Sequence, residues 1–261
     1  MRPDRRHGRN SEPPTSIYPV DRPLQTGRNY VNGSQTKPQS DDEIAALRTE
    51  LLAGAATLGV VLDDQAADRL LQFLELMRRW NGVYNLTAIR DPHGMLVQHL
   101  LDSLAIVPAL RRQCGIGGDA RPLRLLDVGS GGGLPGVVLA ITCPALQIHC
   151  VDAVAKKAGF IRQAGAELGL PNLHSHHSRV EQLKLPAFDV VTSRAFASLA
   201  DFVRWTRPLV APGGRWLAMK GVRPDAEIAA LPADVAMLHV EPIVVPGDPG
   251  ERCIVWLQPA T

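Results

Sequence analysis

The chain of 261 residues carries 28 Lys/Arg against 26 Asp/Glu, and 45% of its residues are hydrophobic. This length and apolar content predict a globular protein with a sizeable core, built as one domain or as one domain with a small appendage. No apolar run reaches the roughly 18 residues of a membrane span, and no apolar segment follows the basic start, so we expect neither a transmembrane helix nor a secretory signal.

Residues 1–40 concentrate the positive charge, with seven Lys/Arg, three Asp/Glu and six prolines, whereas the remainder of the chain has a net charge of −2. Their apolar residues show no periodicity, so this segment cannot bury enough surface to offset its ordering entropy. We predict a disordered basic tail, with a basic arm that touches RNA as the alternative. RNA binding by the remainder of the chain would require its basic residues to gather on one face.

Residues 41–115 are expected to form a helical layer, because three amphipathic segments follow one another with no strand between them. Ser40 to Asp42 and Asp63-Asp64 offer N-caps for the first two helices. Asp91-Pro92 opens a third helix, since proline suits the first helical position, and its apolar residues predict one continuous helix to about Leu110.

Strands and helices alternate over residues 120–261, which predicts a right-handed α/β sheet. The last two strands face each other across the turn residues Pro246–Gly250, so an antiparallel hairpin is expected at the end. The predicted strands cover 123–128, 146–151, 173–177, 188–193, 215–219, 235–245 and 253–257, and the predicted helices cover 155–168, 199–209 and 225–231.

A glycine-rich loop, Asp127–Gly136, connects the first strand to the following helix. Glycines there let the backbone turn sharply and approach a ligand closely, at the strand end where open α/β sheets bind small molecules. Gly131–Gly136 satisfies G-x-G-x-x-G, and Asp152, at the end of the second strand, could accept hydrogen bonds from two ribose hydroxyls. Nicotinamide dinucleotide and S-adenosylmethionine both fit this pattern.

Three features favour S-adenosylmethionine. Asp127 lies two residues before Gly129, where a carboxylate would attract a sulfonium and repel a pyrophosphate. The chain has no second βαβαβ half to hold a nicotinamide ring, and the terminal hairpin is the usual ending of a methyltransferase sheet. An NAD-dependent oxidoreductase is the alternative.

Five segments, taken together, closely resemble the RsmG (GidB) family of small-subunit ribosomal RNA guanine-N7 methyltransferases, in order over residues 43–258. They are Trp80–Thr87, His99–Ser103, Asp127–Gly136, Ser193–Ser198 and Ala218–Gly221. The resemblance implies a class I, Rossmann-like sheet and a monomeric, cytoplasmic enzyme. It also implies that the enzyme transfers a methyl group from S-adenosylmethionine to N7 of one guanine in 16S rRNA, either as RNA or in the 30S subunit.

The resemblance also implies a set of cofactor-binding residues. Asp152 takes the ribose by general methyltransferase analogy, and Val180 with Glu181 frames the adenine through a backbone amide and a carboxylate. The complete expected set is Gly129, Gly131, Gly133, Leu134, Asp152, Val180, Glu181 and Arg194.

Arg194 is the residue expected at the reaction centre, where its fork could hold the methionine carboxylate, guanine O6 or a phosphate. Guanine N7 carries an in-plane lone pair and needs alignment with the methyl carbon rather than deprotonation, so a site without an obvious general base fits. Phe196 could stack the target base or pack in the core. A catalytically inert RNA-binding assembly factor that retains the pocket is the second alternative.

No metal site is expected. His174, His176 and His177 share one strand, with no carboxylate or thiol at ligand spacing. The four scattered cysteines form no C-x-x-C pair, so we expect free, reduced thiols in a cytoplasmic protein.

Overall fold

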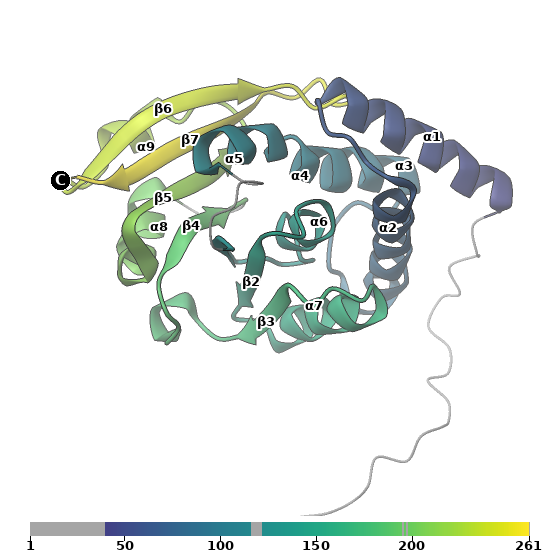
Figure 1. Ribbon diagram of the computed structural model, residues 1–261, viewed down its shortest axis with the longest axis horizontal. Coiled ribbons are helices and arrows are strands. Elements are labelled where there is room, and N and C mark those ends of the chain that lie inside the picture. The colour runs from purple at the N-terminus through teal and green to yellow at the C-terminus, as the bar shows by residue number, and fades with distance from the viewer. Residues whose placement is uncertain (1–39, 116–121, 195, 197, 261) are drawn as a thin grey trace, which may run out of the picture. The chain divides into compact units, whose positions relative to one another are not determined.

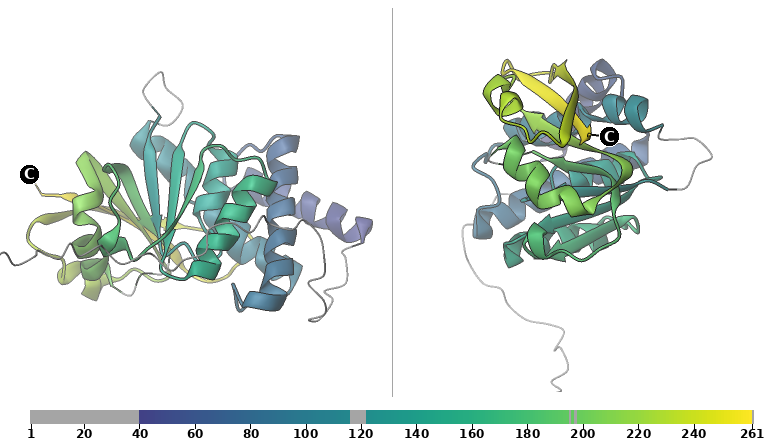
Figure 2. Two further views of the ribbon diagram at one scale, coloured as in Figure 1. Left: turned by 90° about the horizontal axis from the view of Figure 1, so that it is seen from below. Right: turned by 90° about the vertical axis from the view of Figure 1, so that its left-hand side faces the viewer.

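The computed structural model describes residues 40–115, 122–194, 196 and 198–260. The predicted tail, apart from Ser40, lies outside these residues. Within them, seven strands form one sheet, and helices lie on both of its sides (Figures 1 and 2).

The helical layer begins at the predicted caps. The side chains of Ser40, Asp63 and Asp91 accept hydrogen bonds from backbone N–H groups three residues further on, which satisfies donors that a helix start leaves free. The elements are α1 (Asp41–Thr57), α2 (Asp64–Tyr84), α3 (Pro92–Met95), the π-helix η1 (Leu96–Leu101), α4 (Asp102–Leu104) and α5 (Val107–Cys114).

The prediction of one continuous helix from Asp91 to Leu110 is wrong. The segment widens into a π-helical turn, η1, ends at Leu104 and restarts at Val107. Pro108 lies in the first turn of α5, where the backbone N–H that it lacks would have no helical partner. In the interior of a continuous helix its ring would clash with the carbonyl four residues earlier, so the preceding helix ends before it. The apolar periodicity continues through both interruptions, so it does not signal them.

The sheet has the order β3-β2-β1-β4-β5-β7-β6. β1 to β5 pair in parallel, whereas β7 runs antiparallel to both β5 and β6, which confirms the terminal hairpin and the class I arrangement. The strands are β1 (Arg124–Val128), β2 (Gln147–Asp152), β3 (Leu173–His177), β4 (Phe188–Ser193), β5 (Val210–Lys220), β6 (Val235–Ile243) and β7 (Arg252–Pro259).

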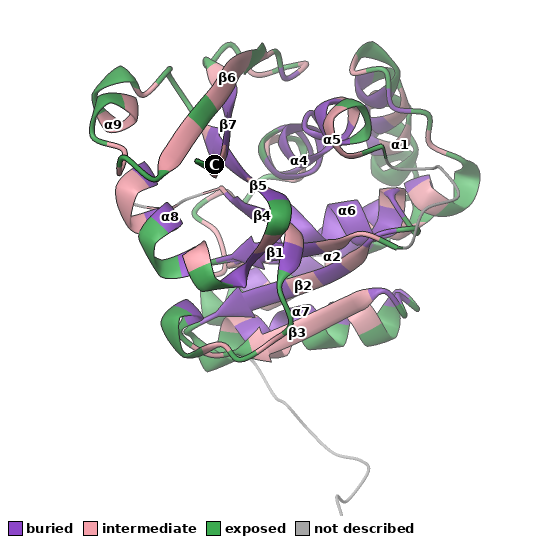
Figure 3. Cartoon of the chain, turned by 60° about the vertical axis from the view of Figure 1, so that its left-hand side comes forward, coloured by how far each residue is buried: buried purple, intermediate pink, exposed green. Residues whose placement is uncertain are grey.

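Two apolar clusters cover the two faces of the sheet. One joins the helical layer to the face that carries Leu125, Ile148 and Leu217, and the other packs α8 on the face that carries Leu126 and Trp216. Helix α6 is buried along most of its length, whereas the edge strands β3 and β6 are largely half-buried or exposed (Figure 3). The remaining elements are α6 (Gly136–Thr142), α7 (Ala155–Glu167), η2 (Val180–Gln182), α8 (Leu199–Thr206), η3 (Arg207–Leu209) and α9 (Asp225–Ala229).

All four cysteines are free, as expected. Among the described residues, no helix is both long and apolar enough to cross a lipid bilayer.

Candidate functional site

The glycine loop lies between β1 and α6, at the edge of the sheet where the parallel strands end. Gly129, Gly131 and Gly133 have φ values of 68°, 57° and 80°, which L side chains adopt only with strain. At Gly133 a Cβ would also lie 2.5 Å from Cγ2 of Val137, so the loop closes against α6 only with glycine there.

The backbone N–H groups of this loop are largely used within the protein. Those of Gly129 and Ser130 donate to the Val151 carbonyl of β2, and those of Gly133 and Leu134 donate to the Ser130 carbonyl. The N–H of Gly131 donates to Asp152 at 2.9 Å, and that of Gly136 to Asp127 at 3.0 Å. A pyrophosphate bound in the dinucleotide manner needs such donors to be free, and here six of them already have acceptors.

Asp127 lies underneath the loop, with no exposed surface. Its carboxylate caps the start of α6 through Gly136, and burial raises the pKa of this carboxyl to about 7 although the hydrogen bond from Gly136 opposes the shift. The expectation that Asp127 faces a sulfonium is therefore wrong in its geometry: the side chain points into the core.

A cavity of about 240 Å³ opens beside the loop and brings together four of the predicted residues. Gly129 comes from the loop, Asp152 from the end of β2, and Val180 and Glu181 from η2 after β3. A Cβ on Gly129 would meet nothing within 4 Å, so this edge of the loop faces open space. Asp152 accepts from Gly131 and Val154, and each of its oxygens keeps a second lone pair for a ligand.

The other loop residues of the predicted set do not line this cavity. Gly131 supports it indirectly, by donating to Asp152. Gly133 and Leu134 form the turn into α6, and the Leu134 side chain is 3% exposed. The structure thus gives these three residues a role in shaping the loop.

Arg194 follows β4, the neighbour of β1, and leans toward the helical layer. Its Nη1 donates to the Gln98 carbonyl at 3.0 Å and lies 3.4 Å from Oδ2 of Asp102. About a quarter of its side chain is exposed. The predicted reaction-centre residue is therefore held through Nη1 by η1 and α4, and it is not among the residues that line the cavity beside the glycine loop.

Two aromatic residues line the cavity without having been predicted to do so. Phe196 and Trp205 come from the segment after β4 and from α8, and their ring centroids lie 5.4 Å apart in an edge-on contact. Sequence reasoning left Phe196 between base stacking and core packing, and it missed Trp205. The signal that could have revealed Trp205 is its helical position, because a large aromatic residue there lies off the buried face of α8, which consists of Leu199, Phe202, Val203 and Thr206.

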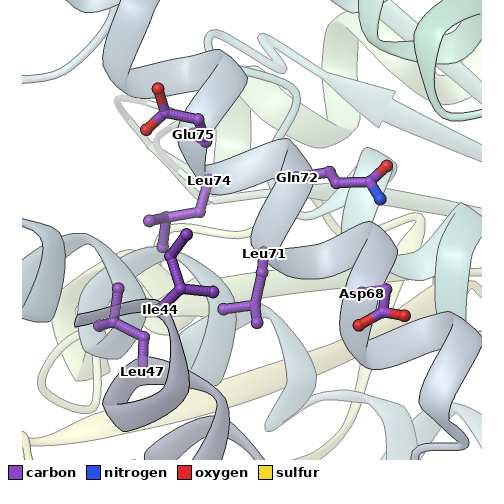
Figure 4. A pocket seen from close by; sticks show the side chains of 7 residues that line it. All are labelled: Ile44, Leu47, Asp68, Leu71, Gln72, Leu74 and Glu75. Atoms are coloured by element: carbon purple, nitrogen blue, oxygen red, sulfur yellow. The ribbon is translucent and has the colours of Figure 1, made fainter. Parts of the chain in front are cut away.

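A separate cavity of about 390 Å³ lies between α1 and α2 and is mostly apolar (Figure 4). It belongs to the helical layer and includes no residue of the glycine loop or of the strand ends. Its lining residues are Ile44, Leu47, Asp68, Leu71, Gln72, Leu74 and Glu75.

The histidines of β3 lie beside a histidine of β2. His149 Nδ1 lies 3.0 Å from His176 Nε2, and the His149 ring also contacts His174. Burial lowers the pKa of His149 to about 3. Over the described ranges, no group of three or more histidine, cysteine or acidic side chains has a metal-binding arrangement.

Most of the chain is similar to known proteins. The GidB family, described as rRNA small subunit methyltransferase G, matches residues 66–254. A relative from Leptothrix cholodnii is 62% identical over 212 residues, which cover 81% of this chain and 95% of the relative. A relative from Acidovorax sp. strain JS42 is 61% identical over 213 residues, with 80% and 94% covered. Both are named Ribosomal RNA small subunit methyltransferase G.

Among solved structures, that of TrmN from Thermus thermophilus matches with a TM-score of 0.48 and 18% identity, over 84% of this chain and 79% of that one. The family match spans most of the described sheet and about two thirds of the helical layer, and the two relatives align over nearly their whole length. The chain therefore belongs to the rRNA small subunit methyltransferase G (GidB) family.

Proposed function

We propose that this protein transfers a methyl group from S-adenosylmethionine to N7 of one guanine in 16S rRNA, presented as RNA or within the 30S subunit. Membership of the family supports a methyltransferase of small-subunit rRNA. The observation in the structure that carries the choice of donor is the glycine loop, whose N–H groups are engaged internally beside a cavity lined by two carboxylates.

The residues of the cavity suit an adenosyl group. Asp152 would accept hydrogen bonds from the ribose hydroxyls, and Glu181 with the backbone of Val180 would contact the adenine edge. Phe196 and Trp205 would supply an apolar wall for the base. Gly129, Gly131, Gly133 and Leu134 would give the loop the shape that admits this ligand.

S-adenosylmethionine, when bound, supplies an electrophilic methyl group. The protein's task is then to hold the guanine so that the N7 lone pair points at that carbon. Arg194 is the residue proposed to do this, by holding either the carboxylate of the donor or O6 of the base with its guanidinium. No side chain has to remove a proton before the transfer, because N7 is unprotonated in guanine.

Two measurements test the proposal. Calorimetry with S-adenosylmethionine, S-adenosylhomocysteine and NAD should show binding of the first two. Binding of NAD alone would instead identify an oxidoreductase. Mapping of methylated guanines in 16S rRNA from cells that lack the protein should reveal one guanine without its N7 methyl group.

The Arg194→Ala variant should abolish this methylation while its thermal unfolding stays cooperative. Unchanged turnover would refute the role of Arg194. Absence of methylation by the wild-type protein on naked rRNA, on 30S subunits and on assembly intermediates would favour an inert RNA-binding factor.

A further inference from the structure

Two arginines from distant parts of the sequence meet on one buried carboxylate, Asp102. Arg194, after β4, lies 3.4 Å from Oδ2, and Nε of Arg252, at the start of β7, donates to Oδ1 at 3.1 Å. The Asp102 side chain is only 6% exposed, whereas each arginine is 28% exposed. A carboxylate this deeply buried requires charged partners, because desolvation of an unpaired ion is costly.

The π-helix η1 and the residue that follows it provide both hydrogen-bond acceptors of Arg194. Asp102 directly follows the π-helix η1, and Gln98 within η1 gives its carbonyl to the same Nη1 that faces Asp102. π-helical turns are rare and frequent at functional sites. Here the turn brings one carbonyl and one carboxylate to the same guanidinium nitrogen.

The two arginines use their donors differently. Each of the three guanidinium nitrogens of Arg252 donates a hydrogen bond: Nε to Asp102, Nη2 to Asp248 at 2.6 Å and Nη1 to the Glu251 carbonyl at 2.9 Å. Both hydrogen bonds that Arg194 makes among the described residues involve Nη1. Its Nε and Nη2 therefore remain for a ligand. The hydrogen bonds of Arg252 therefore suit a structural role, whereas Arg194 is fixed at one nitrogen and has donors left to bind a ligand.

We propose that Asp102 is a positioning residue. It holds Nη1 of Arg194 against the repulsion of Arg252, so that Nε and Nη2 of Arg194 face the reacting groups. The inference rests on the role of Arg194 in the proposed function and extends it to a residue of the helical layer. Asp102 itself touches no substrate.

The neighbouring histidine supports the same arrangement. His99, one turn before Asp102, is buried and bonds Thr87 through Nε2 at 2.9 Å. Burial and then the charge of Arg194 lower the pKa of His99 to about 4. Its imidazole is therefore neutral at neutral pH and adds no repulsion to Arg194, which leaves Asp102 and the Gln98 carbonyl as the groups that orient it.

The chain offers a matched control. Asp102→Asn and Asp248→Asn are both isosteric, and each removes one carboxylate from Arg252, but only Asp102 contacts Arg194. Methylation kinetics would be measured for both variants in the wild-type background and in Arg194→Lys. We expect Asp102→Asn to lower kcat/KM at least about tenfold in the wild-type background and less than about twofold beside Arg194→Lys, because interacting residues do not act additively.

Asp248→Asn should change kcat/KM less than about twofold in either background. An equal loss for Asp102→Asn in both backgrounds, or an equal loss for both single variants, would mean that Asp102 only stabilises the fold. If Asp102→Asn does not fold, Asp102→Glu keeps the charge and displaces the carboxylate by one methylene. It should fold and still lose about tenfold in kcat/KM, and full activity of this variant would overturn the inference.

A spectroscopic measurement separates this inference from the proposed function. In ¹⁵N NMR of arginine side chains, the signal that disappears in Arg194→Lys belongs to Arg194. The N–H groups on its Nη1, the nitrogen that donates to Asp102, should exchange with water at least about tenfold faster in Asp102→Asn and at the wild-type rate in Asp248→Asn, whether or not any RNA is methylated. Unchanged exchange in Asp102→Asn would refute the tether, whereas an inactive wild-type protein with the predicted exchange would refute only the proposed function.

Discussion

At the residue scale, Asp127 has a structural role and not the ligand-facing role that its place in the sequence suggests. The sequence places it two residues before the first loop glycine, and the structure turns its carboxylate into the core, where it caps α6. Oδ1 has no hydrogen-bond partner among the described residues. A carboxyl in this setting is held more easily in its neutral form, because the protein interior solvates charge poorly.

This predicts a specific dependence of stability on pH. The folded-state pKa of Asp127, about 7, lies above the ordinary value of 3.8, so between these values the folded protein binds a proton that the unfolded chain has lost. The stability that this proton contributes is complete below about pH 4 and is lost as pH rises to about 7.

Asp127→Asn keeps an acceptor for Gly136 but cannot ionise. Its melting temperature relative to the wild-type protein should therefore rise by several degrees between pH 4 and pH 7, a gain of about 3 kcal/mol. His99, whose lowered pKa acts in the opposite direction, is present in both proteins and drops out of the comparison. Calorimetric melts of the two proteins over this pH range measure the difference, and a constant difference would contradict the assignment.

At the scale of elements, α8 contributes to the cavity as well as to the core. Its inward residues Phe202 and Val203 are buried, while Trp205 reaches the cavity beside Phe196. Trp216 and Trp256 are fully buried, and Trp80 packs on α7 through Phe160. Trp205 is therefore the tryptophan whose surroundings a ligand in this cavity would change.

We expect S-adenosylhomocysteine to alter the tryptophan fluorescence of the wild-type protein and of Trp80→Phe, but not of Trp205→Phe. Trp205→Ala should raise the dissociation constant about three- to tenfold, because an aromatic contact contributes about 0.5–1.5 kcal/mol beyond its buried area. Titrations followed by fluorescence and by calorimetry test both statements. A response that survives in Trp205→Phe would place the ligand elsewhere.

At the scale of the whole molecule, both apolar clusters depend on β7. Ile254 and Trp256 belong to the cluster shared with the helical layer, and Val255 and Leu257 belong to the cluster under α8. A chain that stops after residue 250 should therefore show no cooperative thermal transition by circular dichroism, since it loses β7, the strand between β5 and β6, and part of both cores. A chain that stops after residue 260 is the control, and a cooperative melt of the shorter chain would refute the prediction.

Much of the fold could be predicted from the sequence, because its signals are local. Alternating strands and helices, caps at Ser40 and Asp63 and the turn at Pro246–Gly250 each lie within a few residues of the element they define. Four of the predicted cofactor residues line one cavity for a similar reason: parallel strands bring their carboxyl ends to one edge. Their contact with a ligand stays a prediction, as does the division into 1–40, 41–115 and 120–261.

The rest depends on contacts that no local pattern encodes. Asp102 and Arg194 are 92 residues apart in the sequence, and Asp102 and Arg252 are 150 apart. The π-helical turn that presents Asp102 is invisible in a continuous apolar periodicity, because it adds a residue without changing the type of residue that is buried. The burial of Asp127 is likewise decided by the packing of α6 above it.

The insertion of β7 between β5 and β6 has a consequence for protein synthesis. Translation delivers β6 before β7, so the nascent polypeptide carries β6 with no neighbour to pair with until residues near 259 have emerged. Arg252 arrives in the same interval, and with it the second partner of Asp102. The ion pairs of Asp102 are thus completed late in synthesis, together with the pairing of β7 with β5 and β6. An interrupted translation product would contain the glycine loop but would not be a competent enzyme.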